Sequence, residues 1–141
     1  MRHHTLATLL STALLLGGTA FAADGLHVTV SDIRNANGHV LLLVSPSAEA
    51  WDGAAKPAAV ARLAAVEGSI EHVFADLAPG DYAVQVMHDE NDNGDLDSNF
   101  VGIPVEGYGF SQNPNVMRRA TFDEARFALP AEGTAIPIRL R

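Results

Sequence analysis

Several short runs in this chain are apolar and β-prone, and most of them alternate with period two. The runs cover residues 26–33 (LHVTVSDI), 39–44 (HVLLLV), 69–77 (SIEHVFADL) and 82–87 (YAVQVM). Successive side chains of a strand point to opposite faces of a sheet, so each run predicts a strand. Many short strands and no long helical pattern predict an all-β fold, a single β-sandwich of about seven strands.

The segments between these runs suggest how the strands connect. Residues 35–38 (NANG) tolerate positive φ, so they predict a turn that joins the first two runs as a hairpin. Residues 78–81 (APGD) predict a second turn, in which Pro79 presets φ and Gly80 accepts a positive φ. Further strands are expected at 58–66, 119–129 and 135–140, a loop or short helix at 45–57, and one long ordered loop at 88–115.

The first 22 residues have the layout of a secretory signal peptide. Arg2 provides a positive charge, residues 6–16 are largely apolar, and residues 20–22 (AFA) form a small-residue cleavage site. We expect cleavage between Ala22 and Ala23, which leaves residues 23–141 as one exported domain, periplasmic or secreted. The alternative is an uncleaved amphipathic helix or a membrane anchor, although the apolar run is short for spanning a bilayer.

Charge and cysteine content narrow the possible partners. The chain carries 17 Asp and Glu against 9 Lys and Arg, a formal net charge of −8. Such a surface repels nucleic acid and anionic lipid and favours the binding of cations. The chain contains no cysteine, so it cannot use the disulfides that stabilise many small exported domains. A bound metal is the other common means of stabilising a small domain.

Residues 88–97 (HDENDNGDLD) contain the spacing of a calcium-binding loop. Oxygen-bearing side chains recur at alternate positions, a glycine occupies the sixth position, and the seventh residue offers its backbone carbonyl. The expected ligands are Asp89, Asn91, Asn93, Asp95 through its backbone, and Asp97 directly or through water. The carboxylates in this segment repel one another unless solvent or a cation neutralises them, so the sequence predicts a structural Ca²⁺.

The loop differs from an EF-hand in two respects. The twelfth position, where an EF-hand carries a bidentate glutamate, is Phe100, and the run before the loop predicts a strand instead of a helix. The last ligands must therefore come from elsewhere, with Glu106, Asn99 or Asp92 as candidates. The alternative interpretation is an acidic loop of Asx turns that binds no metal.

Residues 100–113 (FVGIPVEGYGFSQN) alternate glycines with bulky apolar residues, which is typical of an ordered loop packed on a sandwich. Tyr108, Phe110, Gln112 and Asn113 are candidates for a platform that recognises a carbohydrate or a peptide. Solvent-exposed rings would support such a platform. The sequence favours the alternative, in which these aromatic rings fill one end of the core.

A metal-dependent hydrolase that uses His88 and Asp89 is a further alternative, and it would need an open metal position in a pocket. A zinc or copper site would require three of the histidines His27, His39, His72 and His88 to converge. The sequence contains no nucleophile elbow, His-Glu-x-x-His pair or phosphate-binding loop, so we expect no catalytic activity.

Two segments resemble a known family. Residues 88–114 (HDENDNGDLDSNFVGIPVEGYGFSQNP) and 120–127 (ATFDEARF) resemble exported bacterial proteins grouped as domain of unknown function two-one-four-one. The resemblance covers most of residues 23–141, is strongest over 82–129, and implies no activity. Residues 74–84 (FADLAPGDYAV) are similar to a turn that joins two strands of one sheet in prealbumin-like and surface-adhesin sandwiches. This implies a prealbumin-like or immunoglobulin-like sandwich with a metal as a structural staple.

The combined expectation is an exported calcium-binding β-sandwich with a structural or binding role at the cell envelope. We expect a monomer with a protein or glycan partner, with no nucleic acid partner and no membrane span after signal cleavage.

Overall fold

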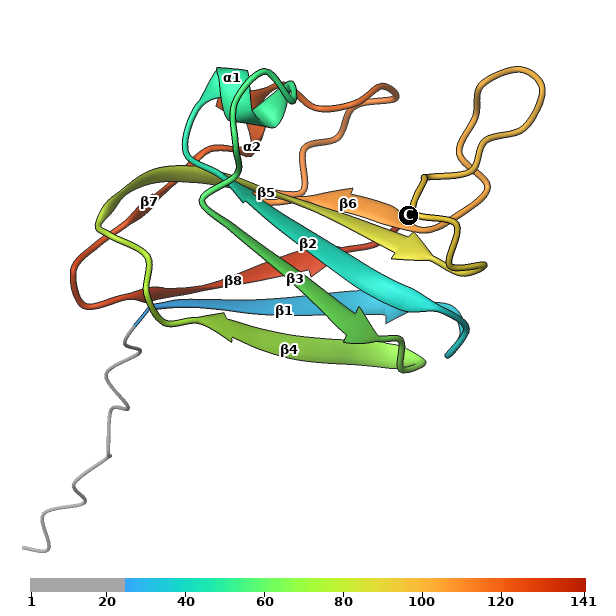
Figure 1. Ribbon diagram of the computed structural model, residues 1–141, viewed down its shortest axis with the longest axis horizontal. Coiled ribbons are helices and arrows are strands. Elements are labelled where there is room, and N and C mark those ends of the chain that lie inside the picture. The colour runs from blue at the N-terminus through green and yellow to red at the C-terminus, as the bar shows by residue number, and fades with distance from the viewer. Residues whose placement is uncertain (1–24) are drawn as a thin grey trace, which may run out of the picture.

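The computed structural model describes residues 25–141, which fold into two facing β-sheets (Figure 1). The elements, in chain order, are β1 (Leu26–Ile33), β2 (His39–Ser45), α1 (Ala48–Trp51), β3 (Ala59–Ala64), β4 (Gly68–Phe74), β5 (Gly80–Asp89), β6 (Tyr108–Phe110), α2 (Phe122–Ala125), β7 (Phe127–Leu129) and β8 (Thr134–Arg139). The predicted signal peptide and its cleavage site at Ala22 and Ala23 lie outside the described residues. No helix within residues 25–141 has the length and apolar character needed to cross a membrane.

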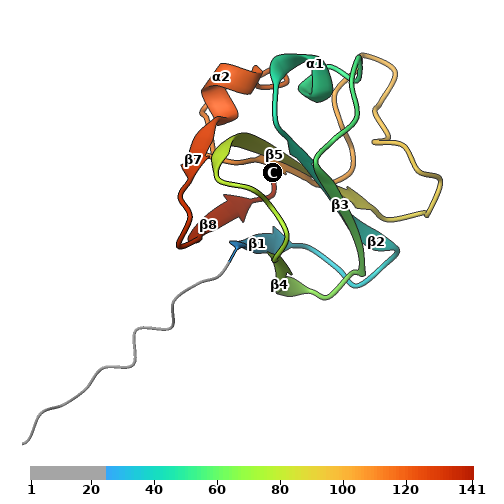
Figure 2. The same ribbon diagram turned by 60° about the vertical axis from the view of Figure 1, so that its left-hand side comes forward.

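The two sheets have different sizes and strand directions. The smaller sheet has the order β4-β1-β8, and the larger has the order β3-β2-β5-β6, with β7 also pairing with β5. In the smaller sheet β1 runs antiparallel to β4 and parallel to β8. In the larger sheet β2 lies between β3 and β5 and is antiparallel to both. Figure 2 shows α1 and α2 side by side at the end of the molecule away from β1 and β4. The all-β sandwich expected from the alternating runs is confirmed.

The main core lies between the two sheets. The fully buried apolar side chains come from alternate positions of the central strands: Leu26, Val28 and Val30 of β1, Val40, Leu42 and Val44 of β2, and Val84 of β5. A second apolar cluster joins α1 and α2 to the other face of the larger sheet, and it contains Trp51, Ala83, Phe110, Ala120 and Ala125. The larger sheet therefore buries apolar side chains on both of its faces.

The predicted hairpin between the first two strands is wrong, because β1 and β2 belong to different sheets. The pairing of β1 shifts register between Ser31 and Ile33, where Asp32 adopts φ 61°. Both strands have a fully apolar inner face, and placing them in opposite sheets buries both faces in one core. The NANG segment therefore crosses between the sheets, and the Asn37 carbonyl contacts His88 Nε2 at 2.7 Å.

The turn before β5 also crosses between the sheets, because β4 and β5 lie in different ones. The expectation that this turn joins two strands of one sheet is wrong. The Tyr82 hydroxyl donates a hydrogen bond to the Ala78 carbonyl at 2.7 Å and fixes the corner. A tyrosine that bonds back to the preceding corner is a known device of β-sandwiches.

Two predicted segments are interrupted by short elements. The strand expected at 119–129 is wrong over most of its length, because α2 occupies its centre and only β7 is extended. Thr121 and Glu124 form a reciprocal capping box that starts α2, a Thr-x-x-Glu signal that is visible in the sequence. The loop expected at 88–115 contains β6, which pairs with Gln85–Met87 of β5.

Two further expectations about secondary structure are confirmed. The alanine-rich run at 58–66 contains β3, and the segment at 45–57 contains the short helix α1. Pro137 lies in β8, which is an edge strand of the smaller sheet. An edge strand tolerates a residue that lacks a backbone N–H group.

Candidate functional site

The acidic loop, residues 89–106, begins inside the sheet. Asp89 is the last residue of β5 and is only 2% exposed. Its Oδ1 accepts a hydrogen bond from the Asn93 backbone at 3.1 Å, and its Oδ2 accepts one from the Gly94 backbone at 2.8 Å. Gly94 has φ 86°, a conformation in which glycine is the least strained residue. The chain therefore makes the tight curl that the calcium-type spacing predicts.

The side chains at the third, fifth and ninth positions of the spacing meet. Asn91 Nδ2 donates to Asp97 Oδ2 at 2.5 Å, and Asn93 Nδ2 donates to both carboxylate oxygens of Asp97 at 3.0 and 3.1 Å. The Asn93 amide oxygen accepts a hydrogen bond from the Asp95 backbone at 2.9 Å. The structure thus brings Asp89, Asn91, Asn93 and Asp97 together, while Asp95 takes part through its backbone.

Glu106 also reaches this loop, and it is buried with 6% exposure. Its Oε1 accepts a hydrogen bond from the Glu90 backbone at 2.9 Å, and its Oε2 accepts one from the Asp97 backbone at 3.0 Å. Glu106 therefore fastens both ends of the curl. Both of its oxygens serve backbone N–H groups, which satisfies donors that would otherwise be buried without partners.

Two other carboxylates of the segment, Asp92 and Glu90, turn towards basic side chains. Asp92 contacts His39 Nδ1 at 2.5 Å and Arg62 at 3.0 Å. Glu90 pairs with Arg34 and accepts a hydrogen bond from Asn35 at 2.9 Å.

Burial raises the pKa of Glu90, but the hydrogen bonds from Asn35 and Arg34 and the nearby positive charges outweigh it and lower the pKa overall. A bound ion was expected to relieve the repulsion among these carboxylates. Positively charged side chains of the protein itself relieve part of it.

The geometry of this loop supports metal binding only in part. Within residues 25–141, no three Asp, Glu or His side chains converge where they could hold a metal ion. Asp89, Asn91, Asn93 and Asp97 offer the carboxylate and amide oxygens that Ca²⁺ prefers. Asn99, considered as an additional ligand, instead accepts hydrogen bonds from the Val101 and Ile103 backbones. Calcium binding stays a prediction that depends on four clustered positions.

The four histidines of residues 25–141 do not converge on one point: His27 and His72 lie on the neighbouring strands β1 and β4 of the smaller sheet, and His39 and His88 lie on β2 and β5 of the larger sheet. His88 is fully buried, with its Nε2 held by the Asn37 carbonyl, and it cannot meet a substrate in this conformation. His39 contacts Asp92, and His72 packs edge-on against Phe74 with the ring centroids 4.6 Å apart.

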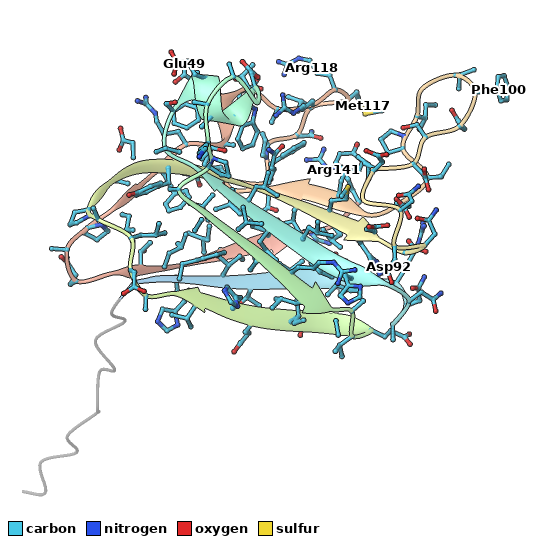
Figure 3. The ribbon with its side chains drawn as sticks, viewed as in Figure 1. Glu49, Asp92, Phe100, Met117, Arg118 and Arg141 are labelled. Carbon is cyan, nitrogen blue, oxygen red and sulfur yellow. The ribbon has the colours of Figure 1, made fainter. Side chains whose placement is uncertain are left out.

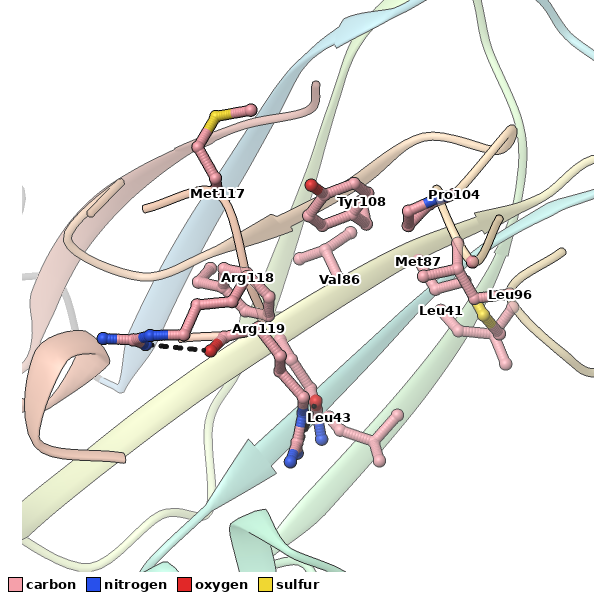
Figure 4. A pocket seen from close by; sticks show the side chains of 13 residues that line it. Leu41, Leu43, Val86, Met87, Leu96, Pro104, Tyr108, Met117, Arg118 and Arg119 are labelled. Atoms are coloured by element: carbon pink, nitrogen blue, oxygen red, sulfur yellow. Dashed lines mark hydrogen bonds between the residues drawn. The ribbon is translucent and has the colours of Figure 1, made fainter. Parts of the chain in front are cut away.

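A groove of about 490 Å³ lies on the outer face of the larger sheet, beside the acidic loop (Figure 4). Its lining comes from β2, β5, β6, the acidic loop and the segment before α2: Leu41, Leu43, Gln85, Val86, Met87, Leu96, Gly102, Pro104, Tyr108, Phe110, Met117, Arg118 and Arg119. In Figure 4, Leu41, Met87, Leu96 and Pro104 gather at one end of the groove. Arg118 and Arg119 lie at the other end.

The run HVLLLV explains the groove floor. Val40, Leu42 and Val44 face the core, so Leu41 and Leu43 must point to the opposite face. A strand that is apolar at consecutive positions is usually covered on both faces. The groove was not predicted, although the lack of alternation in this run indicates a strand that is covered on both faces.

The basic end of the groove is fixed by ion pairs. Arg118 makes two 2.8 Å hydrogen bonds to Glu124, and together with the hydrogen bond from the Thr121 backbone they lower the pKa of Glu124 to about 2. The same contact raises the pKa of Arg118. Arg119 stacks over the Trp51 ring at 5.2 Å and pairs with Asp52 at 3.1 Å. These contacts hold both guanidinium groups in place.

The four platform residues proposed from the sequence divide into two pairs. Both rings contribute to the groove lining: Tyr108 is half-buried, and Phe110 is buried against Trp51 with the ring centroids 5.8 Å apart. Gln112 donates to the Arg126 carbonyl at 3.1 Å. Asn113 accepts from the Arg139 backbone at 2.8 Å and donates to the Pro137 carbonyl at 3.0 Å. The two amide side chains thus link the end of β6 to neighbouring backbone.

Fold and site together define a class of protein: a two-sheet β protein with an acidic loop at one end and an apolar groove beside it. The chain belongs to the family described as "Uncharacterized protein conserved in bacteria (DUF2141)", whose family model matches residues 28–137. No curated protein and no solved structure matches the chain. The family resemblance seen in the sequence is confirmed, and the prealbumin-like resemblance stays a prediction.

Proposed function

We propose that this protein is an exported binding module whose groove holds an apolar peptide segment of a partner protein. The observation that carries the proposal is the groove itself, an apolar hollow of about 490 Å³ on the outer face of the larger sheet. Ligand sites in proteins are typically concave, mainly apolar and of this size, with a few polar groups that orient the ligand. The proposed role is binding and not catalysis.

The composition of the groove favours a peptide over a carbohydrate. Its floor is built from aliphatic side chains such as Leu41, Leu43 and Met87, which cannot hydrogen-bond sugar hydroxyl groups. Tyr108 is the one half-buried ring of the predicted platform, because Phe110 is buried. An apolar side chain has no hydrogen-bonding group, so it can enter this groove without leaving a buried polar group unpaired.

The charge at the rim indicates what flanks the apolar segment. Arg118 and Arg119 lie at one end of the groove (Figure 4). Nearby, Arg141 lies over the rings of Tyr108 and Phe110 at 5.6 and 5.9 Å. Among residues 25–141, no carboxylate forms an ion pair with Arg141. A peptide that carries Asp or Glu next to its apolar residues would therefore match the rim.

A titration with two synthetic peptides tests this function. One peptide carries four apolar residues followed by two aspartates, and the control replaces the apolar residues by serine. Trp51, the single tryptophan of the chain, packs against Phe110 and Arg119 and reports binding by fluorescence. We expect only the apolar peptide to bind, and Leu43→Glu to remove that binding.

A matched variant, Val73→Glu, places the same charge at an exposed position of the smaller sheet and should leave binding intact. Equal binding of both peptides, or binding that survives Leu43→Glu, would refute the groove as the site.

The proposed location follows from the predicted signal peptide. Export through a cleaved signal peptide predicts that the mature protein begins at Ala23. N-terminal sequencing of protein recovered from the periplasm or the medium checks this, and an intact Met1 there would contradict it.

Calcium binding is a second candidate function, and the clustering of Asp89, Asn91, Asn93 and Asp97 favours it. The acidic loop supplies Leu96 and Pro104 to the groove wall, so an ion in the loop would stabilise the binding site. A ligand that binds only the folded state raises the melting temperature by mass action.

Melting curves of metal-stripped protein with and without millimolar Ca²⁺ test calcium binding. We expect calcium to raise the melting temperature of the wild type and of Asp95→Asn, but not of Asp89→Asn. Both substitutions remove one charge, but only Asp89 is buried within the curl. A wild-type curve that calcium leaves unchanged would dismiss this candidate.

A further inference from the structure

The tip of the acidic loop, residues 98–105, is an exposed apolar projection. Phe100 is fully exposed, and Val101 and Ile103 are each 60% exposed. Figure 3 shows Phe100 at the far end of this loop, pointing away from the body of the molecule. Contiguous apolar side chains at the surface usually mark a contact site.

The tip is ordered by its own hydrogen bonds. Ser98 pairs with Pro104 in an isolated bridge, and the Asn99 backbone donates to the Ile103 carbonyl at 2.8 Å. The Asn99 side-chain oxygen accepts hydrogen bonds from the Val101 backbone at 3.1 Å and the Ile103 backbone at 3.0 Å. Because the backbone is already fixed, little conformational entropy is lost when these side chains enter a partner.

The tip has the chemistry that the groove is proposed to bind. Its apolar side chains follow the carboxylates of Asp95 and Asp97, and the groove combines an apolar floor with Arg118 and Arg119 at its rim. Arg118 and Arg119 already pair with Glu124 and Asp52, whereas no carboxylate of residues 25–141 forms an ion pair with Arg141, which lies over the rings of Tyr108 and Phe110. Each molecule therefore carries both halves of a complementary pair: an apolar segment that follows carboxylates, and an apolar groove with the positive charge of Arg141 beside it.

We propose that the tip of one copy inserts into the groove of a second copy of this chain. This inference rests on the proposed binding function of the groove and names its partner. Mutual insertion by two copies gives a closed dimer, and insertion in one direction gives an open chain of copies. A lipid surface fits the tip less well, because the carboxylates at its base are repelled by anionic headgroups.

Sedimentation velocity over a range of protein concentrations tests the self-association. We expect the wild type to shift from the monomer to larger species as concentration rises, and both Phe100→Ser and Leu43→Glu to remain monomeric. Phe100 is fully exposed, so its substitution leaves the core unchanged. An equimolar mixture should form heterodimers, because Phe100→Ser retains the groove and Leu43→Glu retains the tip. A wild type that stays monomeric to millimolar concentration, or a Phe100→Ser variant that still associates, would overturn the inference.

A synthetic peptide of residues 96–106 (LDSNFVGIPVE) separates this inference from the proposed function. We expect it to bind wild-type protein and to lose affinity by about tenfold or more when its phenylalanine is replaced by serine. If the apolar test peptide binds the groove and the 96–106 peptide does not, the groove remains a binding site and only self-insertion fails. Phe100-dependent binding to phosphatidylcholine vesicles without self-association would also overturn self-insertion.

Discussion

Glu106 and Asp97 are joined by a partly buried hydrogen bond, in which the Asp97 backbone N–H donates to Glu106 Oε2 at 3.0 Å. The other carboxylate oxygen of Glu106 accepts from the Glu90 backbone at 2.9 Å. The Glu106 side chain, at the point where the chain returns to the sheet, thus holds both ends of the curl together. The loop wall of the groove depends on this closure, because Leu96 lies next to Asp97 and lines the groove.

Replacing Glu106 by alanine should loosen the loop. The change leaves two backbone N–H groups without their acceptor, at a cost of about 1–3 kcal/mol of unfolding free energy. Glu106→Gln keeps one acceptor oxygen and should cost less. Urea denaturation measures the cost, and amide hydrogen exchange localises it. An Asp97 amide that exchanges at the same rate in wild type and Glu106→Ala would show that this bond does not hold the loop.

Gly38 lies so close to the start of the acidic loop that adding a single methyl group there should lower the stability of the fold strongly. A Cβ on Gly38 would lie 1.9 Å from the Asp89 carbonyl oxygen, and φ there is 62°. Gly53 has a similar φ of 82° but no atom within 4 Å of the corresponding position.

We therefore expect Gly53→Ala to cost about 1–2 kcal/mol from backbone conformation alone and Gly38→Ala to cost clearly more. Thermal melts of the two variants compare them, and equal losses would mean that the close approach of Gly38 to Asp89 is relaxed without cost.

The ion pair between Arg118 and Glu124 predicts a pH dependence of stability. The pKa of Glu124 in the folded protein is about 2, below its ordinary value of 4.5. A lowered pKa stabilises the fold above the ordinary value, and the contribution is lost as the pH falls from 4.5 towards 2. Glu124→Gln cannot titrate but can still accept the Thr121 N–H of the capping box.

The melting temperature of the wild type should therefore fall more steeply between pH 5 and pH 2 than that of Glu124→Gln. Melting curves across this range provide the measurement, since the remaining carboxylates are common to both proteins. Parallel curves would show that Arg118 does not stabilise the charged form of Glu124.

The strands were predictable from sequence because their pattern is local. Residues 26–33 alternate in a way that only a one-sided strand explains, and β1 has those bounds. The sheet to which each strand belongs was not predictable, because the NANG segment suits a hairpin turn within one sheet as well as a connection between two sheets. The pairing depends on whether β1 is stabilised more by β4 and β8 than by β2, which only the assembled core decides.

The candidate site was likewise predictable only where its residues are close in sequence. The curl of the acidic loop follows from the spacing of Asp89, Asn91, Asn93 and Gly94, which are close in sequence. The basic partners of Asp92 and Glu90 come from distant strands and linkers, so the spacing could not reveal them. The floor of the groove left a signal in the run HVLLLV, but the walls come from segments that meet only in the folded chain, so the position of the groove could not be predicted.

Ser111 offers a test of how firmly the second apolar cluster is tied to the larger sheet. Its fully buried hydroxyl accepts a hydrogen bond from the Val84 backbone at 2.8 Å and donates to the Ala125 carbonyl at 2.5 Å. Ser111→Ala leaves a buried donor and a buried acceptor unpaired, so we expect a loss of about 1–3 kcal/mol.

Ser98→Ala, at an exposed loop position, should change the unfolding free energy by less than about 0.5 kcal/mol. Guanidinium unfolding followed by Trp51 fluorescence gives both values. Similar values for the two variants would mean that water or a shifted backbone replaces the Ser111 bonds.

The parallel pairing of β1 with β8 joins segments that are more than a hundred residues apart, with Leu26 opposite Thr134 and Ser31 opposite Arg139. A chain that emerges N-terminus first from a ribosome or a translocation pore presents β1 long before β8 is available. Until then one edge of β1 lacks its partner strand and exposes its hydrogen-bonding groups. Productive folding must therefore await nearly complete emergence, and an escort that shields β1 during this interval would limit premature strand pairing between chains.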